Sequence, residues 1–424
     1  MKKIHVYTSA ACNYIPKVRT LVRSIKKFHP DWIVHLALSD ELPPGFDLSQ
    51  EPFDEIHPLS SLGIADARGW AFCHTIVELS TAIKPFLLAH LLGRDDCGGV
   101  IYLDPDTVLF SPIDEVLEAL VHSNIALTPH LVDPEHSLAG VMDNEISCLR
   151  HGIYNLGFLA VAPTEIGKQF AQWWSDRLYY FCRAEIHNGL FTDQRWIDLA
   201  PAFFEGVCVL RTPRLNAAPW NLSTRTITGE LPNSVKVDGE PLGFYHFTGF
   251  DSGAHRMMAQ KYAGDQPTVA ALIEWYDNAI ADTGDDPLSK VVWAYSRFAD
   301  GTPIPKAARV IYRERLDLQR AFPDPFATQG GGYRAWWETQ GPVEYPALFD
   351  EDAGTVALAT HRLSAGLTPG YQAGGNIPDG PSGDPSATHG NIPMAPRPRG
   401  RSLKRAWEVL RTEGVGGIAK RVLR

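Results

Sequence analysis

Two aspartates separated by one residue follow an apolar run in the first third of the chain. The run from Val100 to Leu103 is typical of a buried β-strand, and Asp104 and Asp106 come directly after it. Because alternate side chains of an extended backbone point the same way, both carboxylates can face one ligand. Carboxylate oxygens suit Mg²⁺ or Mn²⁺, and such a cation can bridge to a diphosphate. The pair therefore predicts a divalent-metal site at the end of a strand.

Two other interpretations of this motif are open. Asp104 can simply end a strand while Asp106 turns the chain, since short motifs of this kind arise by chance. The string from Asp104 to Val108 also resembles the opening motif of haloacid-dehalogenase-like phosphatases, in which the first aspartate is a nucleophile. Those enzymes usually carry the motif on their first strand and need a later acidic pair after an apolar strand. Gly284–Asp286 is the only tempting match, and it follows an amphipathic helix, so we favour the metal site.

The elements around the aspartate pair alternate between strands and helices. We expect strands at 4–7, 33–38, 100–103, 124–129, 155–162 and 208–210, and helices at 16–28, 75–92 and 164–181. A further helix is expected to open at Ser111–Asp114, with Ser111 as its cap and Pro112 in its first turn. This alternation predicts an α/β fold around a mostly parallel sheet. Such sheets bind ligands at the carboxyl ends of their strands, where the aspartate pair lies.

The pattern changes after about residue 265. We expect an α/β domain over 1–265 and a helical appendage over 266–345, with helices at 269–281 and 288–298. A Pro/Gly-rich linker is expected over 346–400, because Pro369–Gly400 holds seven Gly and seven Pro and cannot bury a core. A basic amphipathic tail follows over 401–424.

Charge is distributed unevenly along the 424 residues. The chain has a net charge of −10, but Arg397–Arg424 holds nine Lys and Arg against two Glu, a net of +7, which leaves −17 for residues 1–396. A body this acidic repels phosphate backbones and argues against a nucleic-acid partner. Leu403, Trp407 and Leu410 form an apolar stripe flanked by basic residues, which predicts peripheral contact with an anionic membrane. A solvated tail that folds back on the acidic body is the alternative.

Composition points to a cytoplasmic protein. The six cysteines are scattered without a C-x-x-C motif, which favours free thiols in a reducing compartment. His5 and Thr8 interrupt the apolar run after Met1–Lys3, so no secretory signal is expected. No apolar stretch is long enough to span a bilayer. We therefore expect a cytoplasmic location, with peripheral contact at the inner membrane face through the tail.

Several short motifs occur in an order that resembles the GT-A glycosyltransferases, most closely their glycogenin and bacterial galactosyltransferase group. The resemblance covers roughly residues 1–265. It rests on Thr8-Ser9-Ala10 with Tyr14, Lys84, Asp104-Pro105-Asp106, Asn155-Leu156-Gly157-Phe158, Asp193-Gln194, Trp220-Asn221 and His246-Phe247-Thr248-Gly249. It implies a GT-A (Rossmann-like) fold, a nucleotide-sugar donor, in particular a UDP-sugar, and transfer of a hexose with retention of configuration. The acceptor stays open among a glycan, a lipid-linked and a protein acceptor.

The resemblance also implies roles for individual residues. The metal would be held by Asp104, Asp106 and His246, and the imidazole favours Mn²⁺ over Mg²⁺ because nitrogen is the softer ligand. Asp193 and Gln194 are the catalytic candidates, which would orient the acceptor or stabilise the sugar cation. The donor-binding candidates are Thr8, Ser9, Ala10, Tyr14, Lys84, Tyr102, Asp104, Asn155, Gly157 and Gly249.

Each of these roles has a purely structural alternative. Tyr14 could pack at a helix start, Lys84 could be solvated, and His246 could be a core histidine. Asn155 could belong to a turn, and Asp193 could cap a helix over 194–199. The group also typically has a Lys near the diphosphate after His-x-x-Gly, whereas Phe250–Gly253 follows here and leaves the phosphate clamp unassigned. A catalytically silent domain that only binds sugar nucleotide is a further alternative.

Overall fold

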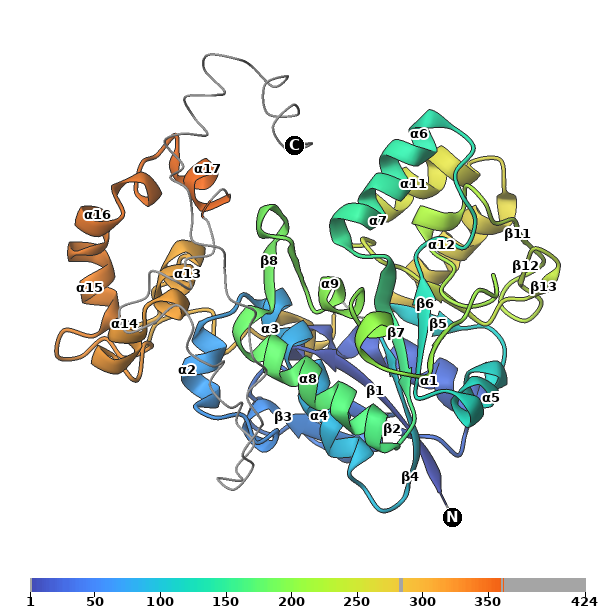
Figure 1. Cartoon of the computed structure of the whole chain (residues 1–424), viewed down its shortest axis with the longest axis horizontal. Coiled ribbons are helices and arrows are strands. Elements are labelled where there is room, and N and C mark those ends of the chain that lie inside the picture. Colours follow the sequence, from blue (N-terminus) through green and yellow to red (C-terminus); the bar gives the residue numbers. More distant parts are fainter. Residues whose placement is uncertain (1, 282–284, 360, 362–424) are drawn as a thin grey trace, which may run out of the picture. The chain divides into compact units, whose positions relative to one another are not determined.

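A seven-stranded sheet forms the core of the fold (Figure 1). The structure is a computed structural model, and it describes residues 2–281, 285–359 and 361. The only antiparallel pairings within this sheet are those of β7 with β4 and with β6; the other neighbours are parallel. In sheet order the strands are β10 (Val207–Val209), β6 (Ile125–Pro129), β7 (Tyr154–Val161), β4 (Cys97–Leu103), β1 (Lys3–Ala10), β2 (Ile33–Leu38) and β3 (Glu55–Pro58). The prediction of an α/β fold with a mostly parallel sheet is confirmed.

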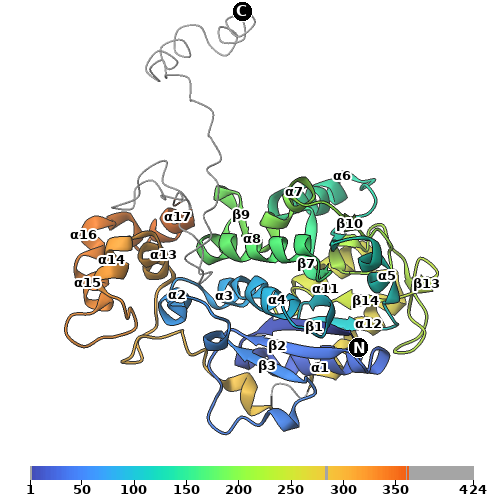
Figure 2. The ribbon, with the colours of Figure 1, turned by 60° about the horizontal axis from the view of Figure 1, so that its bottom comes forward.

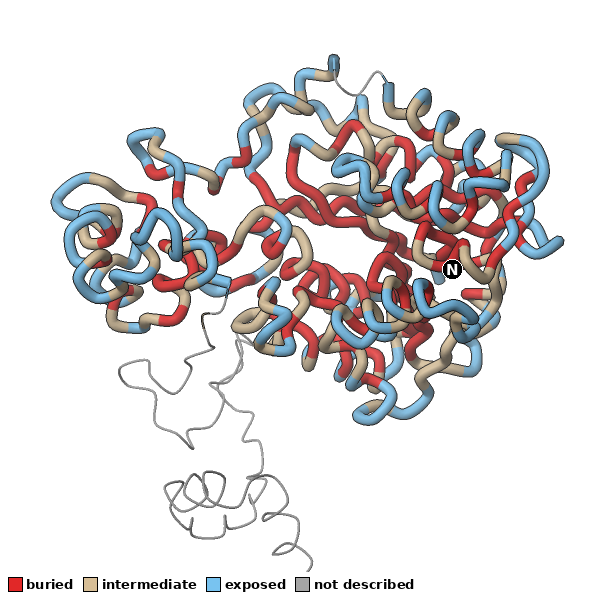
Figure 3. The backbone as a smooth tube through the Cα atoms, turned by 90° about the horizontal axis from the view of Figure 1, so that it is seen from above, coloured by how far each residue is buried: buried red, intermediate tan, exposed pale blue. Residues whose placement is uncertain are grey.

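Helices cover both faces of the sheet. Alternate strand residues point to opposite sides, so Tyr7 and Tyr102 pack into one core cluster while Val6 and Ile101 pack into another. The first cluster lies under α4 (Lys84–Leu92) and α8 (Glu165–Phe181), and the second lies against α1 (Ile15–Phe28) and α5 (Asp114–His122). Figure 2 shows α4 and α8 on one side of the strands and α1 on the other. The central strands and the inward sides of these helices are mostly buried, whereas the two edge strands β10 and β3 are half-buried (Figure 3).

The predicted helix over 75–92 is two helices. α3 (Ile76–Ala82) begins with a capping box, in which the Thr75 hydroxyl accepts from the Glu78 N–H and the Glu78 carboxylate accepts from the Thr75 N–H. It ends at Ile83, and α4 begins at Lys84 with Pro85 in its first turn. Proline has no N–H to continue the first helix but suits the start of the second. The interruption places Lys84 at a helix start, where it is 2% exposed.

Two other expectations for helices were wrong. The Ser111 hydroxyl does not cap α5 but donates to the carbonyl of Leu242, 2.7 Å away, and α5 begins at Asp114 without a side-chain cap. The expected helix over 288–298 is only the short 3₁₀ turn η8 (Pro287–Lys290). The backbone after it bonds to distant groups instead, because the Ala294 N–H donates to the Asp40 carboxylate, 2.9 Å away.

Smaller elements extend the sheet domain. β5 (Thr107–Leu109) pairs with β14 (Phe244–His246), and β8 (Arg183–Glu185) pairs with β9 (Leu190–Thr192). A small sheet of β11 (Ile227–Thr228), β12 (Lys236–Val237) and β13 (Glu240–Pro241) lies between β10 and β14 in the sequence. The remaining helices before residue 282 are α2 (Ala67–Phe72), α6 (Leu138–Gly140), α7 (Ile146–His151), α9 (Gln194–Ile197), α10 (Ala200–Phe203), α11 (Ala254–Ala263) and α12 (Pro267–Ile280). α12 packs against this domain, with the ring of Tyr276 stacked 3.8 Å from that of Phe247.

Short helices follow from residue 306. They are α13 (Lys306–Glu314), α14 (Leu316–Ala321), α15 (Tyr333–Thr339), α16 (Gly341–Glu344) and α17 (Gly354–Ala359). The domain boundaries at 265, 345 and 400 stay predictions, and α17 falls inside the stretch expected to be linker. The basic tail over 401–424 lies outside the described residues. None of the described helices is both long and apolar enough to cross a lipid bilayer.

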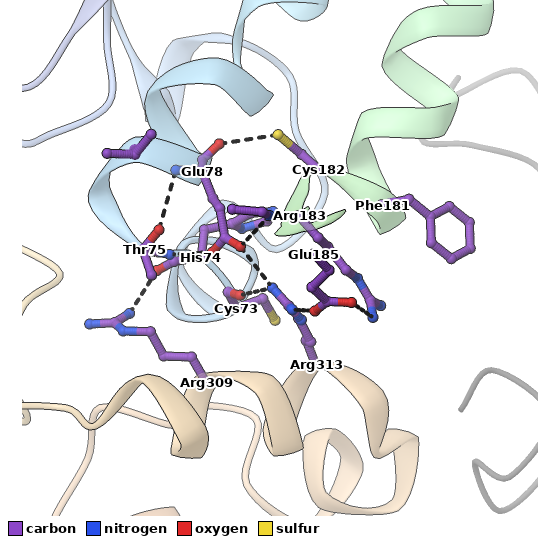
Figure 4. Close-up of polar contacts among 12 residues, drawn as sticks. Cys73, His74, Thr75, Glu78, Phe181, Cys182, Arg183, Glu185, Arg309 and Arg313 are labelled. Atoms are coloured by element: carbon purple, nitrogen blue, oxygen red, sulfur yellow. Dashed lines mark hydrogen bonds and ion pairs between the residues drawn. The ribbon is translucent and has the colours of Figure 1, made fainter. Parts of the chain in front are cut away.

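Buried charges join α13 to the sheet domain (Figure 4). Arg313 pairs with the Glu78 carboxylate at 3.4 Å and also with Glu185. Arg183 in turn pairs with Glu314 at 3.0 Å. Glu78 is 2% exposed and also accepts from the N–H of Ala184 at 3.0 Å. Each of these side chains has an opposite charge beside it, which is the condition for a buried ion to be tolerated.

The charge on Glu78 gives a testable pH dependence. Burial alone would raise its pKa, but Arg313 and the Thr75 N–H outweigh burial and lower the pKa from 4.5 to about 2. A carboxyl whose pKa is depressed on folding contributes stability above its unfolded pKa, and this is lost as the pH falls through its folded pKa. Glu78→Gln should therefore cost about 3 kcal/mol at pH 7, the lower end for losing one partner of a buried pair. The difference from the parent should shrink steadily between pH 4.5 and 2.

Urea unfolding at pH 7 and at pH 3.5 measures this difference. The matched control is Glu118→Gln, which removes an exposed acid on α5 and should change stability little at either pH. A difference between parent and Glu78→Gln that stays constant with pH would contradict this account of the buried charge.

Candidate metal and donor site

Three potential metal ligands meet at the carboxyl end of β4. Asp104, Asp106 and His246 each offer one ligand atom, and these atoms all lie within 4.8 Å of one another. His246 Nε2 is 3.1 Å from Asp106 Oδ1 and 3.6 Å from Asp104 Oδ2. The two carboxylates are partly exposed while His246 is buried. Two oxygens and one imidazole nitrogen form a donor set that suits Mn²⁺.

Backbone pairing brings these distant parts of the sequence together. The Asp104 N–H donates to the Gly157 carbonyl at 2.9 Å, which joins the end of β4 to β7. β14 pairs with β5 so that His246 lies opposite Thr107, and the Phe247 N–H donates to the Asp106 carbonyl at 2.8 Å. The antiparallel β5–β14 pair therefore fixes His246 beside a carboxylate 140 residues earlier in the chain.

The charges of this group depend on one another. Burial would raise the pKa of Asp106, but the adjacent His246 outweighs burial and lowers it. Burial likewise would lower the pKa of His246, but Asp106 outweighs burial and raises it. Two carboxylates beside one imidazole thus favour positive charge at this point. A divalent cation would supply that charge.

The Asn155 amide orients His246. Asn155 Oδ1 accepts from Asn216 Nδ2 at 3.0 Å and from the Gly157 N–H at 3.0 Å, which identifies it as the amide oxygen. His246 Nδ1 lies 3.2 Å from the same oxygen and donates its hydrogen to it. Nε2 is therefore the atom presented to Asp104 and Asp106. A ligating histidine usually donates its other ring N–H to an oxygen in this way.

A buried lysine crosses the site from the other side. Lys84 Nζ is 3.2 Å from Asp104 Oδ1, 2.9 Å from Asp193 Oδ2 and 3.2 Å from the Leu156 carbonyl. It also lies 4.2 Å above the centre of the Tyr102 ring. Burial would lower the pKa of Lys84, but Asp104 and Asp193 raise it, so the ammonium keeps its charge. Lys84 is thus a buried cation that links the candidate metal ligand Asp104 to Asp193, not a solvated helix residue.

Asp193 and Gln194 follow β9 and are both buried. Asp193 makes no cap bond to the helix after it, and its carboxylate takes the Thr192 hydroxyl at 3.0 Å as well as Lys84. Burial raises the pKa of Asp193, although Lys84 opposes this. Gln194 Oε1 accepts from the Leu156 N–H at 3.0 Å, and its Nε2 donates to the His151 carbonyl at 3.1 Å. Gln194 therefore fixes the start of β7, where Asn155 lies.

The expected donor loop reaches the site through Ser9. The Ser9 hydroxyl is 3.1 Å from that of Tyr102, which donates to Asp104 Oδ1 at 2.5 Å. The Tyr14 hydroxyl lies 3.4 Å from Asp251 Oδ2, and Lys17 pairs with Asp251 and lies 4.6 Å from the centre of the Tyr14 ring. Asp106 and Asp251 both contribute to raising the pKa of Tyr14, after burial. The charge of Asp106 therefore affects the pKa of Tyr14, and the charge of Lys17 affects the pKa of Asp106.

Most of the predicted residues are joined by these contacts. One network of hydrogen bonds and ion pairs joins Ser9, Tyr102, Asp104, Lys84 and Asp193. It continues through Asp106, His246, Asn155, Gly157 and Gln194. Among the residues that the structure describes, no side-chain hydrogen bond or ion pair joins Thr8, Ala10 or Gly249 to this network. Thr8 is buried, the Ala10 carbonyl accepts from the Ser39 N–H, and Gly249 has a φ of +68° that lets its carbonyl accept from the His255 N–H.

Sequence reasoning missed two residues of the site. Asn216 binds Asn155 Oδ1, and His130 Nε2 lies 3.2 Å from Asn155 Nδ2. Neither has a local motif; the available signal was a single asparagine within the apolar stretch from Leu215 to Ala218, and the structure shows that it is fully buried. The acidic pair of the phosphatase alternative offers no support, because Asp286 pairs with Arg19 and bonds the Leu288 N–H.

Two curated proteins that are similar to the chain are uncharacterized proteins of Bacillus subtilis. No family model matches the chain. It is 29% identical over 177 residues to the uncharacterized protein YfnF of Bacillus subtilis, covering 41% of this chain and 57% of YfnF. It is 24% identical over 259 residues to YfnD of the same organism, covering 59% of this chain and 79% of YfnD. The chain thus spans little more than half the length of YfnF.

Two solved structures similar to the chain are glycosyltransferases. The galactosyltransferase LgtC, in complex with donor and acceptor sugar analogs, is 16% identical with a TM-score of 0.38, covering 66% of this chain and 95% of LgtC. The glycosyltransferase GlyE of Streptococcus pneumoniae is 15% identical with a TM-score of 0.38, covering 66% of this chain and 64% of GlyE.

Gly157 gives a test of how tightly His246 is positioned. A Cβ at this glycine would lie 2.5 Å from His246 Nδ1 and 2.7 Å from Asn155 Oδ1, so both side chains would have to move. Gly157→Ala should lower Mn²⁺ affinity by roughly 10- to 100-fold, the effect of disturbing a group that orients a metal ligand. Gly93→Ala is the control, because a Cβ there meets nothing nearer than 3.4 Å.

Titration of free Mn²⁺ by its electron paramagnetic resonance signal measures this affinity. Equal Mn²⁺ binding by parent and Gly157→Ala, with both chains folded by circular dichroism, would show that His246 takes no part in the site.

Proposed function

We propose that this chain is a metal-dependent glycosyltransferase that transfers a sugar from a nucleotide-sugar donor, in particular a UDP-sugar, with retention of configuration. The observation that carries the proposal is the meeting of Asp104, Asp106 and His246 at the carboxyl edge of the sheet, next to the buried Lys84–Asp193 ion pair. Carboxyl edges of such sheets are where α/β proteins bind their ligands. The resemblance of the ordered motifs to GT-A enzymes points to the same chemistry.

The residues present fit a divalent cation. Two partly exposed carboxylates and an imidazole whose Nε2 faces them can hold one ion, and the partial exposure of the carboxylates allows water to supply further oxygen ligands. Bound there, Mn²⁺ or Mg²⁺ would offset the negative charge that develops on the leaving diphosphate. The protein then needs no strong acid on the leaving side.

In the proposed site, Lys84 and Asp193 form a fixed ion pair on the side where the sugar of the donor binds. Lys84 holds Asp104 on one side and Asp193 on the other, so the Asp193 carboxylate is fixed near the metal ligands. In the proposed reaction Asp193 stabilises the positive charge that develops on the sugar. Gln194 acts as a positioning residue, because both ends of its amide are bonded. Its Oε1 accepts from the Leu156 N–H of β7, and its Nε2 donates to the His151 carbonyl.

Two further groups are available to the donor. Trp220 Nε1 is buried beside the His246 ring, 5.4 Å between ring centres, and finds no hydrogen-bond partner within the described part of the chain. Lys17 lies against Tyr14 and contributes to lowering the pKa of Asp106. We assign Lys17 to the place of the missing phosphate clamp. Lys17 is paired with Asp251, just as Arg256 and Lys261, the first two cations after His246 in the sequence, are paired with Asp277 and Asp143. Lys17 differs from them in its contribution to the pKa of Asp106.

Replacing the metal ligands tests the metal requirement. Asp104→Ala and Asp106→Ala should each leave the fold intact but lower the affinity for UDP in the presence of Mn²⁺ by at least roughly 10- to 100-fold, the cost of disturbing the surroundings of a bound metal. His246→Ala should have a smaller effect, because two carboxylates remain. Isothermal titration with UDP, with Mn²⁺ and with EDTA, measures the difference.

The control is Asp277→Asn, which removes an exposed acid paired with Arg256 and should bind UDP as the parent does. If Asp104→Ala and Asp106→Ala bound UDP with parental affinity in Mn²⁺, the proposed metal site would be wrong.

A further inference from the structure

A second group of metal-type ligands lies at the opposite edge of the same sheet. His35 is near the start of β2, and Glu55 and His57 are on β3, the edge strand, with Glu55 opposite His35 in the register. Their ligand atoms lie within 4.8 Å of one another. Because β1, β2 and β4 are parallel, this cluster is at the amino ends of the strands, whereas Asp104 follows the carboxyl end of β4. The two clusters are therefore separate sites.

The three ligand atoms are spaced as the corners of a tetrahedron around one ion. His35 Nδ1 is 3.1 Å from His57 Nε2, and Glu55 Oε2 is 3.5 Å from both nitrogens. With bonds of about 2.0–2.1 Å to nitrogen and oxygen, tetrahedral Zn²⁺ separates its ligand atoms by about 3.3–3.4 Å. The observed spacing is therefore close to the expected one without any movement of the side chains.

Outer groups hold the side chains of His35 and Glu55 as they do around bound metals. His35 Nε2 is 2.9 Å from His5 Nδ1, and His5 Nε2 is 3.3 Å from Asp96 Oδ1. The Glu55 carboxylate accepts from Arg94 at 3.1 and 3.2 Å, and Arg94 also bonds Asp96 at 3.0 Å. Ligating imidazoles and carboxylates are typically fixed by a second layer of hydrogen bonds of this kind. Arg94 stays paired through Asp96 when Glu55 binds an ion.

We propose that His35, Glu55 and His57 bind one Zn²⁺ ion, with a water as the fourth ligand. Two imidazoles with one carboxylate form a three-residue set that Zn²⁺ uses when its fourth position is open, and they discriminate against Mg²⁺ and Ca²⁺, which prefer oxygen. The side chains of Glu55 and His57 are 35% and 13% exposed, so the ion can enter from solvent. The bound ion would tie the edge strand β3 to β2.

The same side chains could instead form only a row of hydrogen-bonded imidazoles that binds no ion. Zn²⁺ titration of the full chain, freed of any histidine tag, separates the two by competition with a chromophoric chelator. Asp106→Asn serves as the reference, because it weakens the other candidate site. The Asp106→Asn chain should bind one Zn²⁺. Adding His57→Gln or Glu55→Gln to it gives two double variants, and each should bind Zn²⁺ more weakly by roughly 10-fold or more. His122→Gln, which changes an exposed histidine on α5, is the matched control.

Co²⁺ provides an independent measure of the ligands. The Asp106→Asn chain should show visible absorption of four-coordinate Co²⁺, and this should disappear in the double variants while their circular dichroism stays parental. The two edge residues are partly exposed, so either substitution alone is sufficient if the other impairs folding. Absence of Zn²⁺ binding to the Asp106→Asn chain, or equal binding by both double variants and the reference, would overturn the proposal.

Discussion

The arrangement of the candidate site depends on the contacts of one buried group, the ammonium of Lys84. It bonds Asp104, Asp193 and the Leu156 carbonyl, and so joins β4, β7 and the residue that precedes α9 around one charge. Removing one partner from a buried ion pair typically costs about 3–5 kcal/mol, because the charge left behind has neither water nor a counter-ion. Three aspartates meet here, and Lys84 alone cannot neutralise them. The remaining negative charge is what a divalent cation between Asp104, Asp106 and His246 would balance.

The architecture explains why two polar clusters occur at opposite edges of one sheet. β1 carries His5 near its start and Ser9 near its end, and β4 is preceded by Arg94 and followed by Asp104. Parallel strands bring like ends together, so residues near strand starts gather at one edge and residues after strand ends gather at the other. Each edge therefore collects side chains from strands far apart in the sequence. The two candidate ligand sets, one at each edge, both depend on the strand order of the sheet.

The sequence was most informative where the signal was local. The apolar run before Asp104 and the helical periodicity of Val18, Leu21, Val22 and Ile25 both predicted buried elements that the structure contains. The mostly parallel sheet followed from the alternation of such elements. Pro85 could have predicted the break between α3 and α4, but the apolar composition of 75–92 concealed it. The expected helix over 288–298 does not form, and the Ala294 N–H donates instead to the Asp40 carboxylate. Asp40 lies far earlier in the chain, so no local pattern could indicate this contact.

The candidate site was predictable as a set of residues but not as a network. Asp104 and Asp106 could be paired from their spacing, whereas His246 reaches them only through the pairing of β14 with β5. The ion pair between Lys84 and Asp193 and the binding of Asn216 to Asn155 are long-range contacts, which depend on the folded chain. These contacts also decide which atom of His246 faces the two carboxylates, since the bond from Nδ1 to Asn155 turns Nε2 toward them.

The release of sugar from nucleotide sugars in the absence of an acceptor tests the central claim most directly, since it separates an enzyme from a domain that only binds its ligand. A panel of radiolabelled UDP-sugars incubated with the chain, in Mn²⁺ and in EDTA, shows whether the bond to the diphosphate is broken. The account predicts slow release of free sugar from at least one donor in Mn²⁺, none in EDTA, and loss of that release in Asp106→Ala. Release that is equal in Mn²⁺ and EDTA, or no release from any donor that the chain binds, would contradict it.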